Sequence, residues 1–251
     1  MDASLMNAAT EGFSLPHDIV SLPTGGIFYK SKKKSVKVGY LTAADENFLL
    51  SGLSNKESIV MSLLRNKIYE HDLRPEELLD EDIQAILLFL RNTAFGPEYS
   101  VRLEDPKTGK LFEKTLVLDE LKITQPDNKP TDEGTFSVEL PKTGSKVKLK
   151  PLSFGEILEI DRIIENYPQG RVAPKVTLKL QRQIVEINGD SDKGTIALFV
   201  EQLPIADSKF VRNFLKDNIP SLDLTKKVIA PSGEETNVDI VFGVEFFRPF
   251  F

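Results

Sequence analysis

Cysteine is absent from the 251 residues, and histidine occurs only twice. The missing thiols exclude disulfide bonds, thiolate metal sites and a cysteine nucleophile. His17 and His71 offer too little material for a histidine metal site or a catalytic triad, so we expect both to be ordinary polar residues. The composition therefore predicts neither a cofactor nor a metal.

Long apolar runs and an excess of positive charge are also missing. No segment approaches the roughly 20 apolar residues of a membrane span. The N-terminal segment Met1–Phe13 lacks the basic and apolar regions of a signal peptide. The net charge of -6 argues against a general nucleic-acid binder, which usually has a basic surface. We therefore expect synthesis and residence in a cytosol.

The chain is longer than a typical domain of about 100–150 residues, so one large domain or two small ones are expected. In the first half, the turn sequence Leu22–Tyr29 leads through a polar loop to Val36–Leu41, whose alternation predicts a half-buried strand. Thr42 is placed to cap a helix, and Asp45 lies where a carboxylate meets the positive helix end.

The second half repeats this order of turn, strand and capped helix. The matching segments are the Leu-Pro turn Leu140–Gly144, the strand Val147–Leu152, and the capping pair Ser153 and Glu156. The helix after Ser153 has apolar residues at a spacing of three and four, as one buried face requires.

Two further helices and a β-hairpin follow in each half. Apolar spacing predicts amphipathic helices at Lys56–Tyr69 and Val176–Ile187, and a second pair of helices that begin at Asp80 and Asp207. Proline and glycine favour tight reversals, which predicts a hairpin after each second helix. The expected hairpins are Ser100–Asp119, with the turn Asp105–Gly109, and Leu224–Val241, with the turn Ala230–Gly233.

We interpret the shared order as an internal duplication, which gives an α+β fold of two related halves. The alternative is that capping and turn signals recur by chance in any α+β protein. The predicted organisation is an N-terminal arm at residues 1–21, a first half at 22–123, a linker at 124–136, and a second half with an aromatic C-terminus at 137–251.

Acidic residues gather in two places, and neither pattern predicts catalysis. The acidic residues between Glu76 and Asp82 lie before a predicted helix or in its first turn. Negative charge stabilises this end of a helix, so we expect a capping role and not acid–base catalysis. Asp190 and Asp192 faintly resemble a calcium loop, but apolar residues follow where ligands are required, so we expect a loop between helices. A hydrolase that uses dispersed carboxylates is a remote alternative.

Phosphate-binding signals are equally weak. Thr24-Gly25-Gly26 lacks the Gly-Lys-Ser/Thr ending of a phosphate loop. The basic run Lys30–Lys34 could contact phosphate or an acidic partner, but a solvated loop is favoured in an acidic chain.

Aromatic residues are concentrated at the C-terminus, where four of the last six residues are phenylalanine. An exposed aromatic cluster is costly, so these side chains dock either into the core of the chain or onto a partner. The N-terminal arm offers the same two possibilities. The candidate partner-binding residues are Phe13, Phe28, Tyr29, Phe246, Phe247, Phe250 and Phe251.

The segment Leu22–Tyr29 resembles the Leu-Pro-Ser/Thr-x-Gly-x-x-Tyr opening of T4-type phage baseplate proteins. The Val-x-Val strand and Leu-Thr-x-x-Asp/Glu-Glu helix start of that family are matched by Val36–Val38 and Leu41–Glu46, and Asn237–Pro249 is similar to its C-terminal pattern. The resemblance implies a hub subunit or hub assembly protein of a contractile tail, made in the bacterial host cytoplasm. Such a protein either stays in the virion tail baseplate or leaves as a transient assembly chaperone or adaptor.

The resemblance also implies paired cysteines at the hairpin turns of many relatives, as in a zinc ribbon. This chain has Asp105–Gly109 and Ala230–Gly233 at those turns, so a zinc site is not carried over. The sequence therefore predicts a non-enzymatic protein whose partners are other phage baseplate or hub proteins. We expect no small-molecule substrate, no membrane span and no nucleic acid.

Overall fold

The computed structural model describes residues 16–50, 56–242 and 244–247. Helices and small antiparallel sheets make up these residues, so the predicted α+β class is confirmed. As far as residue 124 the elements are β1 (His17–Ser21), β2 (Ser35–Gly39), α2 (Ala43–Leu50), α3 (Lys56–Lys67), η1 (Pro75–Glu77), α4 (Asp80–Phe95), β3 (Glu98–Glu104), β4 (Leu111–Val117), η2 (Leu118–Glu120) and β5 (Ile123–Thr124).

The second half begins at β6 and ends with a short helix. Its elements are β6 (Phe136–Glu139), β7 (Lys146–Leu149), α5 (Phe154–Glu165), α6 (Lys175–Gln183), β8 (Ile184–Ile187), α7 (Lys193–Glu201), α8 (Ile205–Asn218), β9 (Ser221–Leu222), β10 (Thr225–Ile229), β11 (Glu235–Asp239) and η3 (Val244–Phe247).

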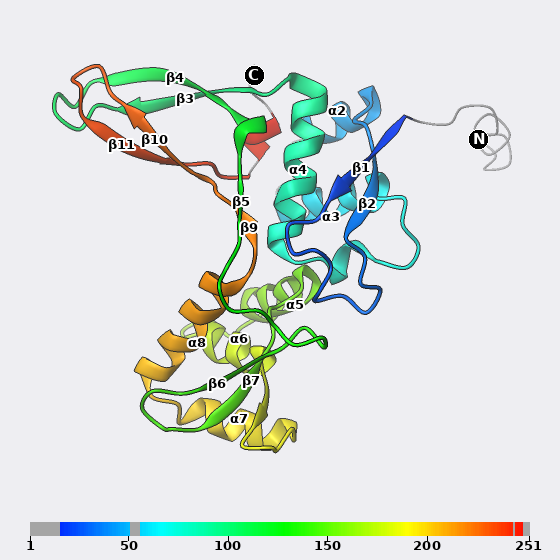
Figure 1. The fold of residues 1–251 in the computed structure, drawn as a ribbon, viewed down its shortest axis with the longest axis vertical. Helices are drawn as coiled ribbons and strands as arrows, with labels where there is room; N and C mark the ends of the chain where they lie inside the picture. Colours follow the sequence, from blue (N-terminus) through cyan, green and yellow to red (C-terminus); the bar gives the residue numbers. More distant parts are fainter. Residues whose placement is uncertain (1–15, 51–55, 243, 248–251) are drawn as a thin grey trace, which may run out of the picture.

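These elements form three parts, which Figure 1 shows. The first part combines β1 and β2 with α2, α3 and α4, and the second combines the sheet β6-β7-β8 with α5 to α8. The hairpins β3–β4 and β10–β11 lie side by side as a third part, although they are far apart in the sequence. The strands β5 and β9 pair antiparallel where the chain runs between the hairpins and the second part.

The first sheet follows the predicted alternation. Val36 and Val38 of β2 are buried, whereas Lys37 between them is exposed, because successive strand residues face opposite sides. β1 pairs antiparallel with β2, and Ile68 just after α3 bridges to Val38 on its other side. The strand predicted after the first Leu-Pro turn is therefore confirmed.

The second sheet corrects one boundary. The helix predicted at Val176–Ile187 ends at Gln183, and Ile184–Ile187 forms β8, which pairs antiparallel with β7. Periodicity alone misread these residues, because β-branched side chains fit a pleated sheet and the partner strand is distant in sequence. Likewise, the loop that contains Asp190 connects β8 to α7 and does not join two helices.

Each Leu-Pro turn binds an aspartate at the third position of a helix. Asp82 of α4 accepts hydrogen bonds from the Thr24 amide at 3.0 Å and the Thr24 hydroxyl at 2.6 Å. Asp207 of α8 accepts hydrogen bonds from the amides of Lys142 at 2.8 Å and Thr143 at 2.9 Å. Asp207 was predicted to start its helix, but α8 begins two residues earlier, at Ile205, so the carboxylate is free to bind the turn.

The two predicted hairpins are confirmed, with the expected turns between their strands. Gly109 and Gly233 have φ values of 65° and 87°, a left-handed conformation that glycine adopts without strain. The turns also contact each other, because the Ser232 amide donates a hydrogen bond of 3.0 Å to Asp105 Oδ2. A side chain of the first hairpin thus fixes the position of the second.

The expected arm and linker contain regular structure at their ends. Residues 17–21 of the expected arm form β1, and the linker predicted at 124–136 begins in β5 and ends in β6. Residues 1–15 lie outside the described part of the chain. Buried apolar side chains from both halves form one continuous cluster, so the core joins the three parts.

Candidate functional site

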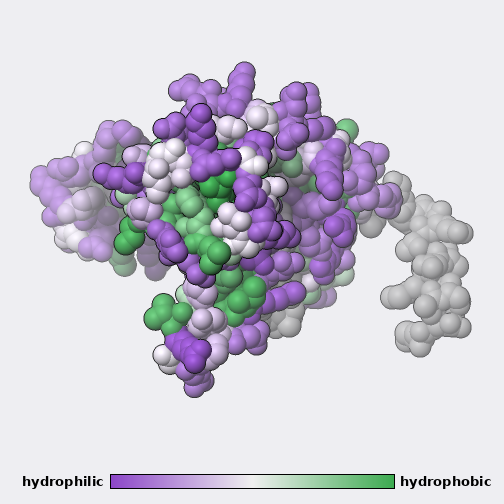
Figure 2. Space-filling model, turned by 90° about the horizontal axis from the view of Figure 1, so that it is seen from below, coloured by the Kyte–Doolittle hydropathy of each residue, from purple (hydrophilic) through white to green (hydrophobic). Residues whose placement is uncertain are grey.

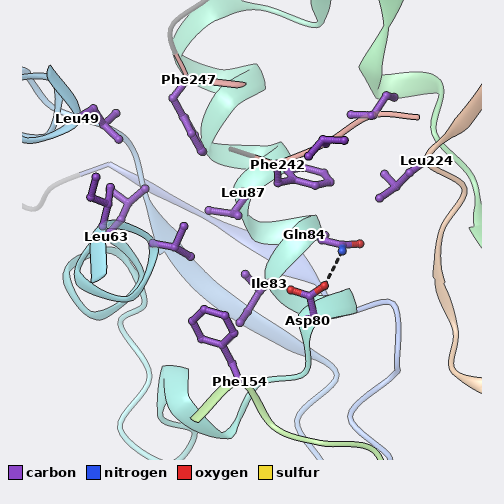
Figure 3. A pocket seen from close by; sticks show the side chains of 14 residues that line it. Leu49, Leu63, Asp80, Ile83, Gln84, Leu87, Phe154, Leu224, Phe242 and Phe247 are labelled. Atoms are coloured by element: carbon purple, nitrogen blue, oxygen red, sulfur yellow. Dashed lines mark hydrogen bonds between the residues drawn. The ribbon is translucent and has the colours of Figure 1, made fainter. Parts of the chain in front are cut away.

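An apolar cavity of about 380 Å³ lies where α3, α4, the start of α5 and the segments after β9 and β11 meet (Figure 3). Side chains from distant parts of the chain line it together. They include Leu63, Leu87, Phe154, Leu224, Phe242 and Phe247. Because these side chains lack hydrogen-bonding groups, this part of the lining suits an apolar group.

Carboxylates lie beside this cavity at the start of α4. Asp80 lines the cavity and accepts a hydrogen bond of 2.7 Å from Gln84 Nε2 (Figure 3). Burial raises the pKa of Asp80, and burial together with the charges of Asp80 and Asp82 raises the pKa of Glu81 to about 7. A cation placed beside an apolar group in the cavity would stabilise the charged form of these residues.

Tyr29 is buried and has a structural role. Its hydroxyl donates a hydrogen bond to Asp82 and accepts one of 3.0 Å from the Leu79 amide. Burial, then the neighbouring Asp82 carboxylate, raises the pKa of this hydroxyl. Phe28 is half-buried, and its ring lies 6.1 Å from that of Phe136. In the described chain, Tyr29 therefore has no surface to offer a partner.

The aromatic C-terminus contributes to the core as far as it is described. Phe246 is 0% exposed and lies 5.5 Å from the ring of Tyr99 and 4.6 Å from that of Phe242. The guanidinium of Arg91 lies 5.8 Å from the centre of the Phe246 ring, which favours a cation–π contact. Phe247 is also buried. Of the remaining aromatic candidates, Phe13, Phe250 and Phe251 lie outside the described residues.

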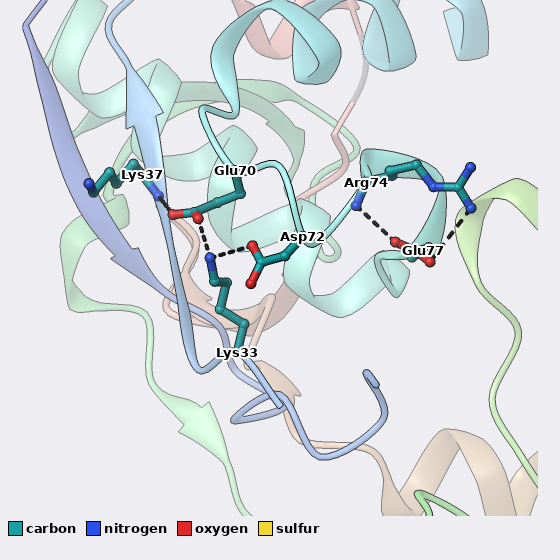
Figure 4. A network of polar contacts seen from close by, with 6 residues as sticks. All are labelled: Lys33, Lys37, Glu70, Asp72, Arg74 and Glu77. Carbon is teal, nitrogen blue, oxygen red and sulfur yellow. Dashed lines mark hydrogen bonds and ion pairs between the residues drawn. The ribbon is translucent and has the colours of Figure 1, made fainter. Parts of the chain in front are cut away.

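The basic run is partly neutralised within the chain (Figure 4). Lys33 forms ion pairs with Glu70 and, at 2.5 Å, with Asp72. These hydrogen bonds raise the pKa of Lys33 and lower the pKa of both carboxyl groups. Lys32 donates hydrogen bonds to the carbonyls of Ile27 and Asp132. Two of the lysines therefore fasten a loop.

The hairpin turns hold no constellation of metal ligands. Within the described residues, no group of three or more His, Cys, Asp or Glu side chains could hold a metal ion. At the turn of the first hairpin, Asp105 accepts hydrogen bonds from the amides of Lys107, Thr108 and Ser232. Both oxygens of this carboxylate therefore accept hydrogen bonds from backbone amides of the chain. Among the described helices, none is long and apolar enough to cross a membrane.

Apolar side chains also reach the surface of the second part. Figure 2 looks at the molecule from the end that β6, β7 and α7 form, and it shows apolar residues among charged ones. Leu198 of α7 is 64% exposed, and Ile205 at the start of α8 is 84% exposed. Single exposed apolar residues are ordinary, but several close together indicate a contact surface.

The cavity and the two aspartate–turn contacts could not be identified from the sequence. Leu63, Phe154 and Leu224 carry no local signal that would bring them together. The only available hint was the repeated Leu-Pro turn, which marked both segments that bind an aspartate.

The fold is a mixed α+β architecture with an apolar hollow between its parts. A family model described as T4 bacteriophage base plate protein matches residues 27–248, so the chain belongs to that family. Membership of this family supports a structural protein of the bacteriophage base plate and a location in the virion tail. Comparison with curated proteins and with solved structures gives no significant match.

Proposed function

We propose that this chain is a structural or assembly component of the baseplate hub of a contractile tail, acting without catalysis through contacts with other baseplate or hub proteins. The family match over residues 27–248 is the observation that carries this proposal. The apolar cavity supports it, because its lining suits an apolar side chain of a partner. Of the carboxylates that could suggest catalysis, Asp82 binds the first Leu-Pro turn and Asp80 accepts a hydrogen bond from Gln84.

The location of the protein over time tests this role. Quantitative mass spectrometry of purified particles and of infected-cell lysate separates a permanent hub component from a transient chaperone or adaptor. A hub component occurs in finished tails at a fixed ratio to other baseplate proteins. An assembly chaperone made in the host cytoplasm occurs only with tail intermediates. Absence from both tails and intermediates would overturn the proposal.

A pair of surface variants tests the cavity as the contact. Val241 lines the cavity and is 70% exposed, so Val241→Asp adds a charge there without disturbing the core. We expect the variant to recover about tenfold less of the tail proteins that co-purify with the wild-type chain. Ile229→Asp is the matched control, because Ile229 is 66% exposed on β10 and does not line the cavity. Equal losses in both variants would contradict a cavity contact.

We also propose that the halves at residues 22–123 and 137–251 descend from one duplicated unit. Three matched features support this. An aspartate at the third position of a helix binds each Leu-Pro turn, and a residue directly after a helix pairs with the central strand of each half. A hairpin also follows the longest helix of each half. An experimental structure in which the two halves do not superpose in this order would contradict the duplication. Phe28, which is half-buried, and Phe13, Phe250 and Phe251 stay candidates for partner binding.

A further inference from the structure

Exposed apolar side chains occur on α5, on α6 and in the loop between them. Ile163 is 42% exposed and Val176 is 46% exposed, and Val172 in the loop between these helices is 94% exposed. In α5 only Phe154 and Ile160 are buried, although the helix carries four further isoleucine and leucine residues in the pattern of an amphipathic helix. The apolar pattern is therefore larger than the core of this chain covers.

Two ion pairs connect α5 and α6, and most acidic side chains of these helices have a basic partner. Lys175 Nζ lies 3.1 Å from Asp161 Oδ1, and an Arg182 nitrogen lies 3.5 Å from Glu159 Oε2. Glu156, in the first turn of α5, pairs with the Nζ of Lys150 at 2.5 Å. Because these contacts fix α5 against α6, the exposed apolar residues belong to a defined surface.

The charges left over on this surface are mainly positive. Among the described residues, Arg162, Arg171 and Lys179 have no acidic partner within ion-pair distance, and Glu165 is the one acidic residue of α5 and α6 without a cation. Each of these cations lies next to an exposed apolar residue in the chain or one helical turn from it. An apolar surface with a basic rim thus occurs on a chain whose net charge is -6.

We propose that the α5–α6 surface binds an acidic segment of another tail protein that carries apolar side chains at helical spacing. The apolar residues of that segment cover Ile163, Val172 and Val176, and its carboxylates pair with Arg162, Arg171 and Lys179. Charge complementarity selects this occupant, since opposite charges at the rim of an interface set specificity and the rate of association. The inference rests on the proposed function and adds the chemistry of one partner.

Charge reversal on the surface tests this contact. The tagged full-length chain replaces the wild-type copy during infection, and the proteins that co-purify with it are quantified by mass spectrometry. The double variant Arg171→Glu/Lys179→Glu should recover about tenfold less of one tail protein. Lys107→Glu/Lys110→Glu, on the turn of the first hairpin, makes the same change of charge elsewhere and should recover the wild-type amount.

A compensating change in the partner decides the result. Changing acidic residues to lysine in the apolar segment of the lost protein should restore its recovery with the double variant. Failure of this rescue, or a lost protein that proves to be a second copy of this chain, would overturn the inference. Equal recovery of tail proteins by both double variants overturns the inference alone. Recovery of no tail protein even by the wild-type chain counts against the proposed function itself.

Discussion

The two halves of the molecule fasten a Leu-Pro turn to a helix in the same way but with different strength. In the first half, Asp82 is buried and binds the Thr24 amide, the Thr24 hydroxyl and the Tyr29 hydroxyl. In the second half, Asp207 is equally buried and binds two backbone amides, those of Lys142 and Thr143. Both halves therefore share a carboxylate–turn contact, and two hydroxyl groups add to it in the first half.

The helices of the two halves also differ in how many of their apolar side chains are buried. In α4, Ile83, Ile86, Leu87 and Leu90 are all buried, whereas α5 and α6 leave several apolar side chains exposed. Burial of apolar area stabilises a fold, so α4 gains more from its apolar face than α5 and α6 gain from theirs. The second half leaves apolar area available, which is what binding a partner requires.

The largest expected effect concerns Phe246, which comes from the second half but packs on Tyr99 and Arg91 of the first. Phe246→Ala should lower the free energy of unfolding by about 3–5 kcal/mol, because it leaves a cavity in the core. Urea denaturation of the purified chain measures this loss. A loss below about 1 kcal/mol would show that the hairpins do not depend on the C-terminus.

The aspartate–turn contacts should separate the halves directly. Asp82→Ala leaves the buried Thr24 and Tyr29 donors without an acceptor, so we expect a loss of about 3 kcal/mol in the free energy of unfolding. Asp207→Ala should cost about 1–2 kcal/mol, because Lys142 is exposed and water can replace the carboxylate. Asp217→Ala, at an exposed position of α8, is the control. Equal losses in the free energy of unfolding for Asp82→Ala and Asp207→Ala would show that the two aspartate–turn contacts are equally strong.

The free energy of unfolding should depend on pH through Glu81, the second residue of α4. The matching position of α8 is Ala206, which does not titrate. Glu81 has a pKa of about 7, above its ordinary 4.5. As the pH rises, the Glu81 carboxyl loses its proton at a lower pH in the unfolded chain than in the folded chain. The stabilisation that protonated Glu81 gives to the fold is therefore complete below pH 4.5 and is lost as the pH rises to about 7. Glu81→Gln should therefore raise the free energy of unfolding by about 1.5 kcal/mol at high pH, after allowance for partial exposure.

Denaturation curves at pH 4.5 and pH 8 check this sign. The gain from Glu81→Gln should be present only at the higher pH. Glu201→Gln, at the exposed end of α7, should change neither curve. A gain of the same size at both pH values would exclude titration of Glu81 as its cause.

The smallest effect concerns the helix caps that were predicted for both halves. The Ser153 hydroxyl accepts a hydrogen bond of 3.3 Å from the Glu156 amide, and the Ser153 amide donates one of 2.9 Å to the Glu156 carboxylate. Ser153→Ala should cost about 1 kcal/mol, the usual loss for an N-cap. Thr42→Ala should cost about 0.5 kcal/mol, because it removes the hydrogen bond of 2.6 Å that the Thr42 hydroxyl donates to Asp45. Thermal denaturation measures both, and a larger loss at Thr42 would reverse the comparison.

Local patterns predicted the elements well where the signal lies within a few residues. The alternation at Val36–Val38, the Ser153 cap and the two hairpin turns are all confirmed. The prediction was wrong at Ile184–Ile187, where pairing with β7 replaced the last helical turn. The partner of a strand is a property of the fold, and no window of sequence contains it.

The sequence by itself determined the α+β class and the absence of thiol chemistry. The resemblance to the baseplate family came from short motifs, and the family match over residues 27–248 confirms it. Only the tertiary structure decided that Phe246 and Phe247 are core residues and that the apolar residues of α5 and α6 stay exposed. Hydrophobicity shows that a side chain gains by leaving water. Which surface covers it depends on contacts between residues far apart in the chain, and those exist only once the chain has folded.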